Sequence, residues 1–300
     1  MKKILGTYEN GNYTVMMFND GTKIRFNNEA TMTADFPESI DMKISNRCDK
    51  SCPMCHEQSV PDGELANLSH PLLDSLHPYT ELALGGGNVL DHPYLFTFLS
   101  RMKDQKVICN MTLHIGHFLD FDPYIKYLQD EGYIHGIGIS VNNVIDSGII
   151  DRIMALPNTV VHTIAGIMPQ EGFKALYDRN IKLLILGYKN YGRGAEYIKH
   201  NTEITNRIED LHNNIMDMMP HFNLISFDNL ALEQLRIKEL VNKDTWERCY
   251  MGDDGEATFY IDLVKEQFAK SSVSPRIDIN SNKIVDLFNQ VRVDCEVHKE

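Results

Sequence analysis

Three cysteines, Cys48, Cys52 and Cys55, lie in the stretch SNRCDKSCPMCHEQS with the spacing C-x3-C-x2-C. Thiolates at such short spacing are typical ligands of a metal ion or an iron–sulfur cluster. The chain contains six cysteines, and half of them fall within eight positions. In a reducing compartment, such a group predicts metal or cluster binding and not a disulfide framework.

Structural zinc is one interpretation of this group, and it requires four ligands around the metal. The fourth ligand usually comes from a second cysteine or histidine pair with its own tight spacing. The remaining cysteines, Cys109, Cys249 and Cys295, stand alone in the sequence. His56 would have to fold back onto a metal held by the adjacent Cys55. The ligand count therefore disfavours zinc.

An iron–sulfur cluster is the other interpretation of the three thiols. A four-iron cluster normally takes four thiolates, so three cysteines leave one iron without a protein ligand. A catalytic metal site keeps such a position open for the molecule on which it acts. The missing fourth thiol therefore indicates a cluster that binds a further molecule.

The segment CDKSCPMC resembles the C-x3-C-x2-C motif of the radical SAM superfamily, and it follows a predicted strand as it does there. The resemblance implies that Cys48, Cys52 and Cys55 bind a [4Fe–4S] cluster whose open iron binds S-adenosylmethionine. One-electron reduction would then yield a 5′-deoxyadenosyl radical that abstracts a substrate hydrogen, with the cofactors supplying the chemistry. An external one-electron donor resembling flavodoxin or ferredoxin is implied as a partner.

Glycines at the end of the next predicted strand match a second feature of that family. Gly85, Gly86 and Gly87 in LGGGNVL stand where a Gly-Gly-Glu-like motif binds the methionyl amino group, but Asn88 replaces the acidic residue. Glycine permits the close backbone approach that such a small group needs. A simple glycine turn out of a strand is the alternative.

Five further residues match positions that bind the cofactor in that family. Met54 stands where a residue near the adenine is usually aromatic, and a thioether can also pack against a ring. Ser140 and Asn142 in GISVNN are candidates for hydrogen bonds to the ribose. Gly187 and Tyr188 in LGYKNYGRG stand where the family binds adenine largely through backbone groups. A polar or flexible loop is the alternative in both segments.

Other side chains could act on the substrate. His114 and His117 in LHIGH follow a predicted strand and could transfer protons, although histidines in such places are often structural. The planar guanidinium of Arg193 could bind a carboxylate or phosphate. Cys249 could donate a hydrogen atom or bind a second cluster, with a partly buried structural role as the alternative. A complete second cluster is not expected, because the three isolated cysteines lack a fourth partner.

Alternating strand-like and helix-like segments are expected to position these residues. From residue 39 to about residue 190, short apolar β-branched segments alternate with amphipathic ones, which is typical of a parallel sheet covered by helices. Six such repeats predict a partial (βα)6 barrel of the radical SAM type, and a doubly wound sheet is the alternative. In either fold, ligands bind at the carboxyl ends of the strands. We expect helix caps at Asp91 and Asp122.

Three parts are predicted along the chain. Residues 1–37 alternate with period two around Gly-containing turns, which predicts an accessory antiparallel β-meander. Residues 38–230 form the predicted barrel. Residues 231–300 contain a predicted β-hairpin in ATFYIDLVKEQFAKSS and a final helix in SNKIVDLFNQV.

Composition limits the compartment and the partners. A content of 43% apolar residues is enough for a sizeable core, and the formal net charge of −13 disfavours nucleic acid and anionic membranes as partners. The apolar run near the N-terminus is too short for a signal peptide, and no segment is long enough to span a membrane. A cytoplasmic location is therefore expected.

The sequence as a whole predicts a radical SAM enzyme that abstracts hydrogen from an unidentified substrate. A partial barrel has a wide lateral opening that suits a peptide or protein, whereas the extra β-elements could enclose a nucleotide-sized metabolite. One alternative is a non-catalytic iron–sulfur or zinc protein that senses redox state or metal. Another is a binding protein on a barrel that has lost its activity.

Overall fold

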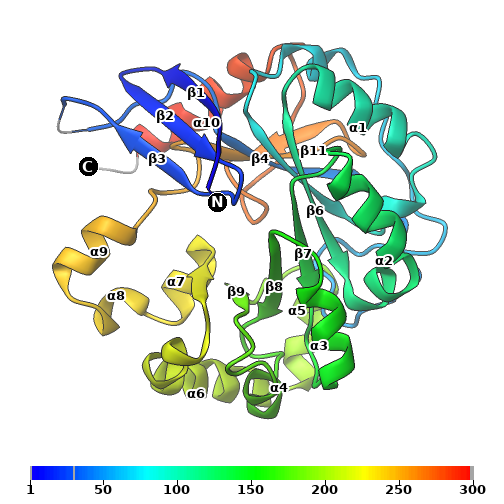
Figure 1. The fold of residues 1–300 in the computed structure, drawn as a ribbon, viewed down its shortest axis with the longest axis vertical. Coiled ribbons are helices and arrows are strands. Elements are labelled where there is room, and N and C mark those ends of the chain that lie inside the picture. Colours follow the sequence, from blue (N-terminus) through cyan, green and yellow to red (C-terminus); the bar gives the residue numbers. More distant parts are fainter. Residues whose placement is uncertain (1, 30, 298–300) are drawn as a thin grey trace.

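The computed structural model describes residues 2–29 and 31–297, with side chains described up to residue 292. This part of the chain contains two β-sheets (Figure 1). The smaller sheet is antiparallel and consists of β1 (Ile4–Asn10), β2 (Tyr13–Phe18) and β3 (Lys23–Phe26). The meander predicted from the N-terminal sequence is therefore confirmed.

The larger sheet has ten strands, and most of it is parallel. Neighbours in sequence are neighbours in space across β4 (Ser39–Ser45), β5 (Glu81–Gly86), β6 (Ile108–His114), β7 (Gly136–Ser140), β8 (Thr159–Ile164), β9 (Lys182–Leu186) and β10 (Leu224–Phe227). On the other side of β4, β11 (Thr258–Asp262) pairs in parallel, and β12 (Gln267–Ala269) and β13 (Ile277–Asp278) follow in antiparallel orientation. The β11–β12 pair is the C-terminal hairpin that the sequence predicts.

The strand order decides between the two predicted architectures. In a doubly wound sheet the order reverses at a switch point, and helices cover both faces. From β4 to β10 the order never reverses, and right-handed crossovers then place the connecting helices on one face. Figure 1 shows α1, α2, α3 and α4 along the outer side of an arc of strands. Across β4 to β10 the doubly wound alternative is therefore wrong, and a largely parallel α/β sheet is confirmed.

Helices connect most of the strands, and α1, α2, α3 and α4 cover the outer face of the sheet (Figure 1). In chain order they are α1 (Leu95–Asp104), α2 (Ile115–Asp130), α3 (Ser147–Met154), α4 (Gln170–Ala175), α5 (Arg193–His200), α6 (Glu203–Met218), α7 (Asn229–Gln234), α8 (Ile237–Leu240), α9 (Lys243–Cys249) and α10 (Ile284–Val297). Short 3-10 helices are η1 (Pro71–Ser75), η2 (Val89–Asp91) and η3 (Met219–His221). Within the described ranges, we find no helix with the length and hydropathy needed to cross a membrane.

The large sheet has one apolar and one polar face, because side chains alternate along each strand. Leu82 and Leu84 of β5 are fully buried in the core, whereas Ala83 and Gly85 are half-exposed. The same alternation in β6 and β7 leaves small or polar residues half-exposed: Asn110, Thr112, His114, Gly136 and Ser140. A closed barrel fills its interior with branched apolar side chains. Here the inner face instead presents small and polar groups that solvent reaches.

Helix starts differ from the predicted caps in two places. Helix α1 begins at Leu95, and Asp91 lies in η2. Helix α2 begins at Ile115, where the His114 ring nitrogen Nδ1 accepts the Gly116 N–H at 3.0 Å. Asp122 therefore lies inside α2 and binds Arg152 at 2.8 Å. Both predicted caps are wrong: His114 satisfies a free backbone donor of α2 before Asp122 is reached, and α1 begins after Tyr94, whose side chain makes no capping hydrogen bond.

The small sheet attaches at the amino ends of the large sheet's strands. Glu38 precedes β4 and accepts hydrogen bonds from the Tyr13 hydroxyl at 2.6 Å and from Arg25 Nε at 2.7 Å. Its side chain is only 2% exposed, so these partners must compensate its buried charge. The cysteines follow the opposite, carboxyl end of β4, so the small sheet lies at the end of the parallel strands away from them.

Candidate functional site

The cysteine loop directly follows β4 at the carboxyl edge of the large sheet. Cys48, Cys52 and Cys55 are all partly buried and lie in one loop between β4 and η1. The Cys48 N–H donates to the Val60 carbonyl at 2.8 Å, and the Cys55 N–H donates to the Cys52 carbonyl at 3.1 Å. The loop is therefore folded back on itself by its own backbone, with the three thiols on one short turn-rich segment.

The loop after β9 braces the cysteine loop from the side. Arg193 donates from Nε to the Cys52 carbonyl at 3.2 Å and from Nη1 to the Ser59 carbonyl at 3.0 Å. Its backbone N–H donates to the Cys55 carbonyl at 3.2 Å. A β-carbon on Gly192 would lie 2.3 Å from the His56 carbonyl oxygen, so the two loops are in close contact. The guanidinium predicted to bind a substrate anion thus holds the cysteine loop instead.

The glycine loop after β5 packs against the start of the cysteine loop. Gly87 N–H donates to the Ser45 carbonyl at 2.7 Å, and Asn88 N–H donates to the Arg47 carbonyl at 2.6 Å. A β-carbon on Gly87 would lie only 2.1 Å from the Arg47 oxygen, which explains why this position requires glycine. By contrast, no atom lies within 4 Å of a β-carbon built on Gly85. The predicted neighbours meet, and Gly85 faces open space.

Asn88 and Gly86 have roles of their own in this loop. The Asn88 side chain is buried and accepts the Leu90 N–H at 3.2 Å, which caps η2. Gly86 has a backbone φ of +105°, a conformation that favours glycine. The Asn88 side-chain oxygen is therefore occupied by the protein where the related motif has an acidic residue.

The thiols fit a cluster better than a single metal ion. Burial raises the pKa of Cys48, and burial together with Cys55 and Cys48 raises the pKa of Cys52, so a metal must displace protons to bind. A zinc ion draws its thiolates to within about 4 Å of one another, since each Zn–S bond is about 2.3 Å. Among the described residues, the group whose ligand atoms converge within 4.8 Å contains just one of these cysteines. Each thiolate of a cluster binds a different iron, which tolerates the wider spacing.

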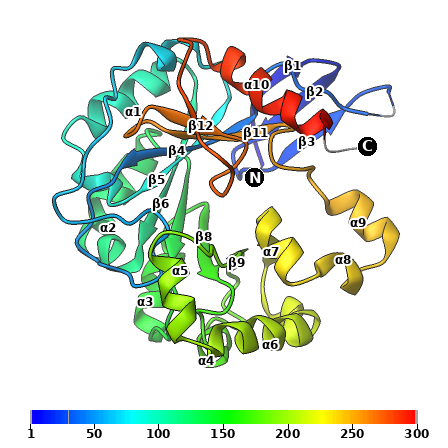
Figure 2. The same cartoon turned by 180° about the vertical axis from the view of Figure 1, so that it is seen from behind.

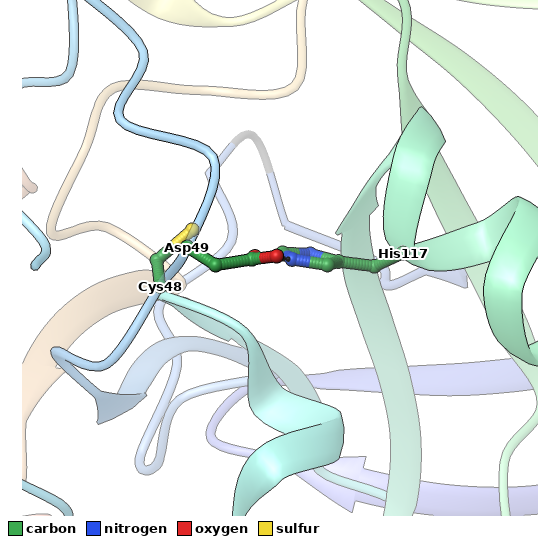
Figure 3. A group of neighbouring side chains, drawn as sticks. All are labelled: Cys48, Asp49 and His117. Atoms are coloured by element: carbon green, nitrogen blue, oxygen red, sulfur yellow. Dashed lines mark hydrogen bonds and ion pairs between the residues drawn. The ribbon is translucent and has the colours of Figure 1, made fainter. Parts of the chain in front are cut away.

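That converging group consists of Cys48, Asp49 and His117, and it joins the cysteine loop to α2 (Figure 3). The buried His117 ring donates from Nε2 to Asp49 Oδ1 at 2.6 Å. This hydrogen bond lowers the pKa of Asp49 to about 2. His117, predicted to act on substrate, therefore ties the loop to the helix, while His114 caps the same helix. A catalytic role for His114 stays a prediction.

Met54 and Tyr188 meet in a small apolar cluster beside the cysteine loop. Tyr188 is buried with Ile167 and Ile204, and Met54 packs against these residues. The Tyr188 hydroxyl donates to the Gly194 carbonyl at 2.7 Å. Two residues predicted separately for the adenine therefore belong to one apolar cluster.

The backbone donors predicted to bind adenine already have protein partners. Gly187 N–H donates to Asp228 Oδ1 at 2.8 Å, and Tyr188 N–H donates to Gln234 Oε1 at 2.7 Å. Gln234 Nε2 returns a hydrogen bond to the Tyr188 carbonyl at 2.8 Å. A role of Gly187 and Tyr188 in adenine binding stays a prediction, and it would have to use other atoms or displace these contacts.

Ser140 and Asn142 lie at the carboxyl edge, as predicted. Ser140 is half-buried, ends β7 and lies in register with His114 on one side and His162 on the other. Asn142 Oδ1 accepts the Ile164 N–H at 3.0 Å and so links the ends of β7 and β8. Their predicted contacts to a ribose remain untested by this geometry.

The isolated cysteines stand in separate environments. Cys109 is buried within β6, and burial strongly raises the pKa of its thiol. Cys249 is exposed at the end of α9, so the predicted partly buried role is wrong for it. The side chain of Cys295 lies outside the described residues. A hydrogen-donor role of Cys249 stays a prediction.

A polar network centred on Glu57 was missed by the sequence analysis. Lys43 Nζ lies 2.7 Å from Glu57 Oε2, and the Tyr260 hydroxyl donates to Glu57 Oε1 at 3.1 Å. His56 Nε2 lies 3.1 Å from the same oxygen. These contacts join the cysteine loop to β4 and β11. The only available signal was the pair His56–Glu57 directly after Cys55, since Tyr260 lies 203 residues away.

The inner face of the sheet also holds perturbed titratable groups. Asp41 of β4 lies on this face, and the surrounding protein with the carboxylates of Asp254 and Asp228 raises its pKa, against the opposing effect of Lys189. Burial lowers the pKa of the half-exposed His162 on β8 to about 4. Such shifts are common where a protein binds or transforms a ligand, so this face is a candidate substrate site.

Comparison with known proteins gives matches at the level of structure. No protein-family model matches the chain, and no curated protein matches it by sequence. SuiB from Streptococcus suis bound to precursor peptide SuiA aligns with a TM-score of 0.60 at 11% identity, covering 89% of this chain and 68% of that one. SuiB bound to S-adenosylmethionine gives 0.58 at 11%, covering 88% and 68%. A further SuiB structure gives 0.59 at 10%, covering 98% and 89%.

These matches show that the chain shares the fold of SuiB over most of its length. At 10–11% identity the likeness is one of fold, and residue roles must be argued from the chain's own geometry. SuiB was solved with S-adenosylmethionine bound. The comparison thus bears on the fold alone, and it agrees with the largely parallel α/β fold that the strand and helix pattern predicts.

Proposed function

We propose that this chain is a radical SAM enzyme in which Cys48, Cys52 and Cys55 hold a [4Fe–4S] cluster whose open iron binds S-adenosylmethionine. The observation that carries the proposal is the position of the cysteine loop. It leaves β4 at the carboxyl edge and lies between the loops that follow β5 and β9, on a fold shared with a protein that binds S-adenosylmethionine. In this proposal the arc of strands from β4 onward is the partial (βα)6 barrel of the family.

The residues of the chain hold the cofactor loop and shape the space beside it. When bound, the cluster and S-adenosylmethionine would supply the chemistry of hydrogen-atom abstraction. Arg193 fixes two carbonyls of the cysteine loop, His117 holds Asp49, and Glu57 anchors the loop to Lys43. A loop fixed on three sides keeps its thiols in place for a cluster, as hydrogen bonds to the ligating residues do in other metal sites.

We assign cofactor binding to residues at the same edge of the sheet. Gly85 supports this assignment most directly, because space is open around it beside the cysteine loop. The other assigned residues are Met54, Gly86, Gly87, Asn88, Ser140, Asn142, Gly187 and Tyr188. An external one-electron donor would reduce the cluster.

A peptide or protein segment is the substrate class that we propose. One SuiB structure was solved with precursor peptide SuiA, and the match to it covers 89% of this chain. The wide polar inner face of the large sheet also suits an extended chain with varied side chains. The reaction that follows hydrogen abstraction is not assigned.

The test is cleavage of S-adenosylmethionine by anaerobically reconstituted protein reduced with dithionite. We expect the wild-type chain to bind iron and sulfide, turn brown and form 5′-deoxyadenosine. Cys52→Ala should lose nearly all of both signals, whereas Cys249→Ala makes the same chemical change at an exposed site and should keep the chromophore.

Three outcomes would reject the proposal. Zinc bound without a brown chromophore would indicate a zinc protein. A stable cluster without 5′-deoxyadenosine would indicate a sensor. Cleavage that survives Cys52→Ala would show that the cysteine loop does not hold the catalytic cluster.

A further inference from the structure

A cavity of about 710 Å³ lies on the opposite side of the molecule from α2, the helix that contacts the cysteine loop (Figure 1). It is formed by α7, α8 and α9 together with the segments around Asp254 and Val273. Figures 1 and 2 show these helices on the opposite side of the molecule from α1 and α2. Its volume falls within the range of pockets that bind ligands, roughly 300–1,000 Å³.

Two stacked aromatic rings form one wall of the cavity. Trp246 lies on α9 and Tyr250 directly follows this helix, with ring centroids 4.7 Å apart and planes at 17°. Both side chains are half-buried. Lys238 Nζ lies 5.6 Å from the Trp246 ring centroid, so the face of this ring already attracts a cation of the protein. Such a wall favours a cation or a flat apolar group.

The lining of the cavity is negative. Four carboxylates, those of Glu233, Glu239, Asp253 and Asp254, outnumber the two basic side chains, Arg236 and Lys238. Arg236 Nη2 binds Glu209, which does not line the cavity, at 2.9 Å, and its Nε lies 3.8 Å from Glu239 of the lining. Lys238 lies over the indole. The four carboxylates still exceed the two bases, so the field inside the cavity attracts positive charge.

The cavity reaches toward the inner face of the large sheet. Asn229 begins α7, lines the cavity and donates from Nδ2 to Asp254 Oδ1 at 2.8 Å. The carboxylates of Asp254 and Asp228 both act on Asp41, which lies on the inner face of β4. Carboxylates thus lie between the cavity and β4, with Lys189 as a nearby base.

We propose that this cavity binds a lysine or arginine side chain of the peptide substrate. The neighbouring part of the same peptide would lie on the inner face of the large sheet. The assignment rests on the proposed function for the identity of the molecule that carries this side chain. The ammonium or guanidinium group would pack on Tyr250, since Trp246 already carries Lys238, and it would pair with Glu233 and Glu239. The volume is larger than one side chain, so part of the peptide backbone would be accommodated as well.

Tryptophan fluorescence tests this proposal directly, because Trp246 is the only tryptophan in the chain. The probe is an acetylated, amidated hexapeptide with two lysines, and the comparison peptide has glutamates at the same positions. We expect a saturable fluorescence change with the lysine peptide and none with the glutamate peptide. The double variant Glu233→Gln/Glu239→Gln should weaken binding by about tenfold or more.

A matched control separates the cavity from the overall charge of the protein. Asp130→Asn/Glu131→Gln makes the same charge change at the end of α2, which lies on the opposite side of the molecule from the cavity (Figure 1). It should leave the dissociation constant unchanged, since exposed charges beyond about 10 Å are screened at ordinary salt. Equal weakening by the two double variants, or equal binding of the two peptides, would overturn the proposal. Unchanged thermal unfolding would show that both variants are folded.

The binding measurement needs no cofactor chemistry, so the two proposals fail separately. Wild-type protein that cleaves S-adenosylmethionine but does not bind the lysine peptide would retain the proposed function and reject the cavity assignment. Protein that binds the lysine peptide at the cavity but makes no 5′-deoxyadenosine would reject the proposed function and keep a cationic peptide site.

Discussion

Single side chains hold the cysteine loop in place from different directions. Arg193 reaches it from the loop after β9, His117 from α2 and Glu57 from within the loop toward β4. None of these contacts depends on the cluster itself. They explain how one short segment can present three thiols at a fixed place, which a flexible loop could not do.

Replacing Arg193 tests this bracing at the residue scale. Arg193→Ala removes two charge-assisted hydrogen bonds to Cys52 and Ser59, and each such bond contributes about 1.5–3 kcal/mol. We expect the reconstituted variant to lose cluster iron faster than the wild type during gel filtration. Arg193→Lys should rescue it only in part, because lysine lacks the planar fork that reaches both carbonyls.

Arg152→Ala is the control for this change, since it removes an arginine from the surface of α3. Its iron content should equal that of the wild type. Full retention of iron by Arg193→Ala would show that the loop after β9 does not support the cluster site.

The lowered pKa of His162 leads us to expect that the stability of the protein depends on pH. Burial holds its pKa at about 4 in the folded chain, below the ordinary value of about 6.5. Between these pH values the unfolded chain binds more protons than the folded chain. The contribution of His162 to the free energy of unfolding is therefore fully present above about pH 6.5 and is lost as the pH falls toward 4. His162→Gln removes this titration.

Urea unfolding at about pH 7.5 and about pH 5 measures the effect. The wild type should lose more unfolding free energy between these two pH values than His162→Gln does. Parallel losses in the two proteins would show that His162 is not held neutral by its surroundings.

The sequence predicts that two residues of the site lie together only where local patterns, such as strand ends, mark both of them. The cysteines, Gly85 and Ser140 lie at strand ends that the apolar pattern marks, so their shared edge was predictable. The partners Glu57 and Tyr260 are 203 residues apart, and they meet because β11 adds to β4 outside the repeat. No local pattern encodes that pairing.

Connections between elements decide how closely the loops approach each other. The strands were predictable because buried parallel strands are short, continuous apolar runs. Helix starts were not, because His114 caps α2 and makes the Asp122 signal redundant. At the carboxyl edge the glycine loop and the cysteine loop touch through their backbones.

Substitutions at Gly85 and Gly87 distinguish the packing of these loops from cofactor binding. Gly87→Ala places a β-carbon against the Arg47 carbonyl, at 2.1 Å if nothing moves. Overpacking of this kind typically costs about 1–3 kcal/mol, so the variant should unfold earlier and retain less cluster. Gly85→Ala meets no atom within 4 Å and should unfold like the wild type.

The informative readout for Gly85→Ala is the KM for S-adenosylmethionine, which should rise while stability stays unchanged. A wild-type KM would remove Gly85 from the cofactor site. Unchanged stability of Gly87→Ala would show that the two loops do not pack as described.

The molecule as a whole connects its predicted parts at opposite ends of the large sheet. The N-terminal sheet is attached through Glu38 at the amino ends of the strands, whereas β11 from the C-terminal part reaches Glu57 at the carboxyl edge. One core cluster includes residues of all three parts, among them Val15, Ile40 and Phe268. The predicted boundaries at residues 37 and 230 stay a prediction.

Glu57→Gln tests the connection between the C-terminal part and the site. The variant keeps the side-chain shape but leaves the buried ammonium of Lys43 with Asp262, at 3.2 Å, as its remaining carboxylate partner. Breaking a buried pair costs about 3–5 kcal/mol, and the remaining partner should reduce this to about 2 kcal/mol. Denaturant unfolding measures the loss, with the exposed Glu196→Gln as a control that should unfold like the wild type.

The open iron is the central claim, and the electron paramagnetic resonance spectrum of the reduced cluster tests it most directly. Anaerobically reconstituted wild-type protein is reduced with dithionite, and its spectrum is recorded before and after S-adenosylmethionine is added. We expect the spectrum to change, because the cofactor binds the iron that no cysteine holds. An identical spectrum with and without S-adenosylmethionine would contradict the claim and leave the cluster without a catalytic ligand site.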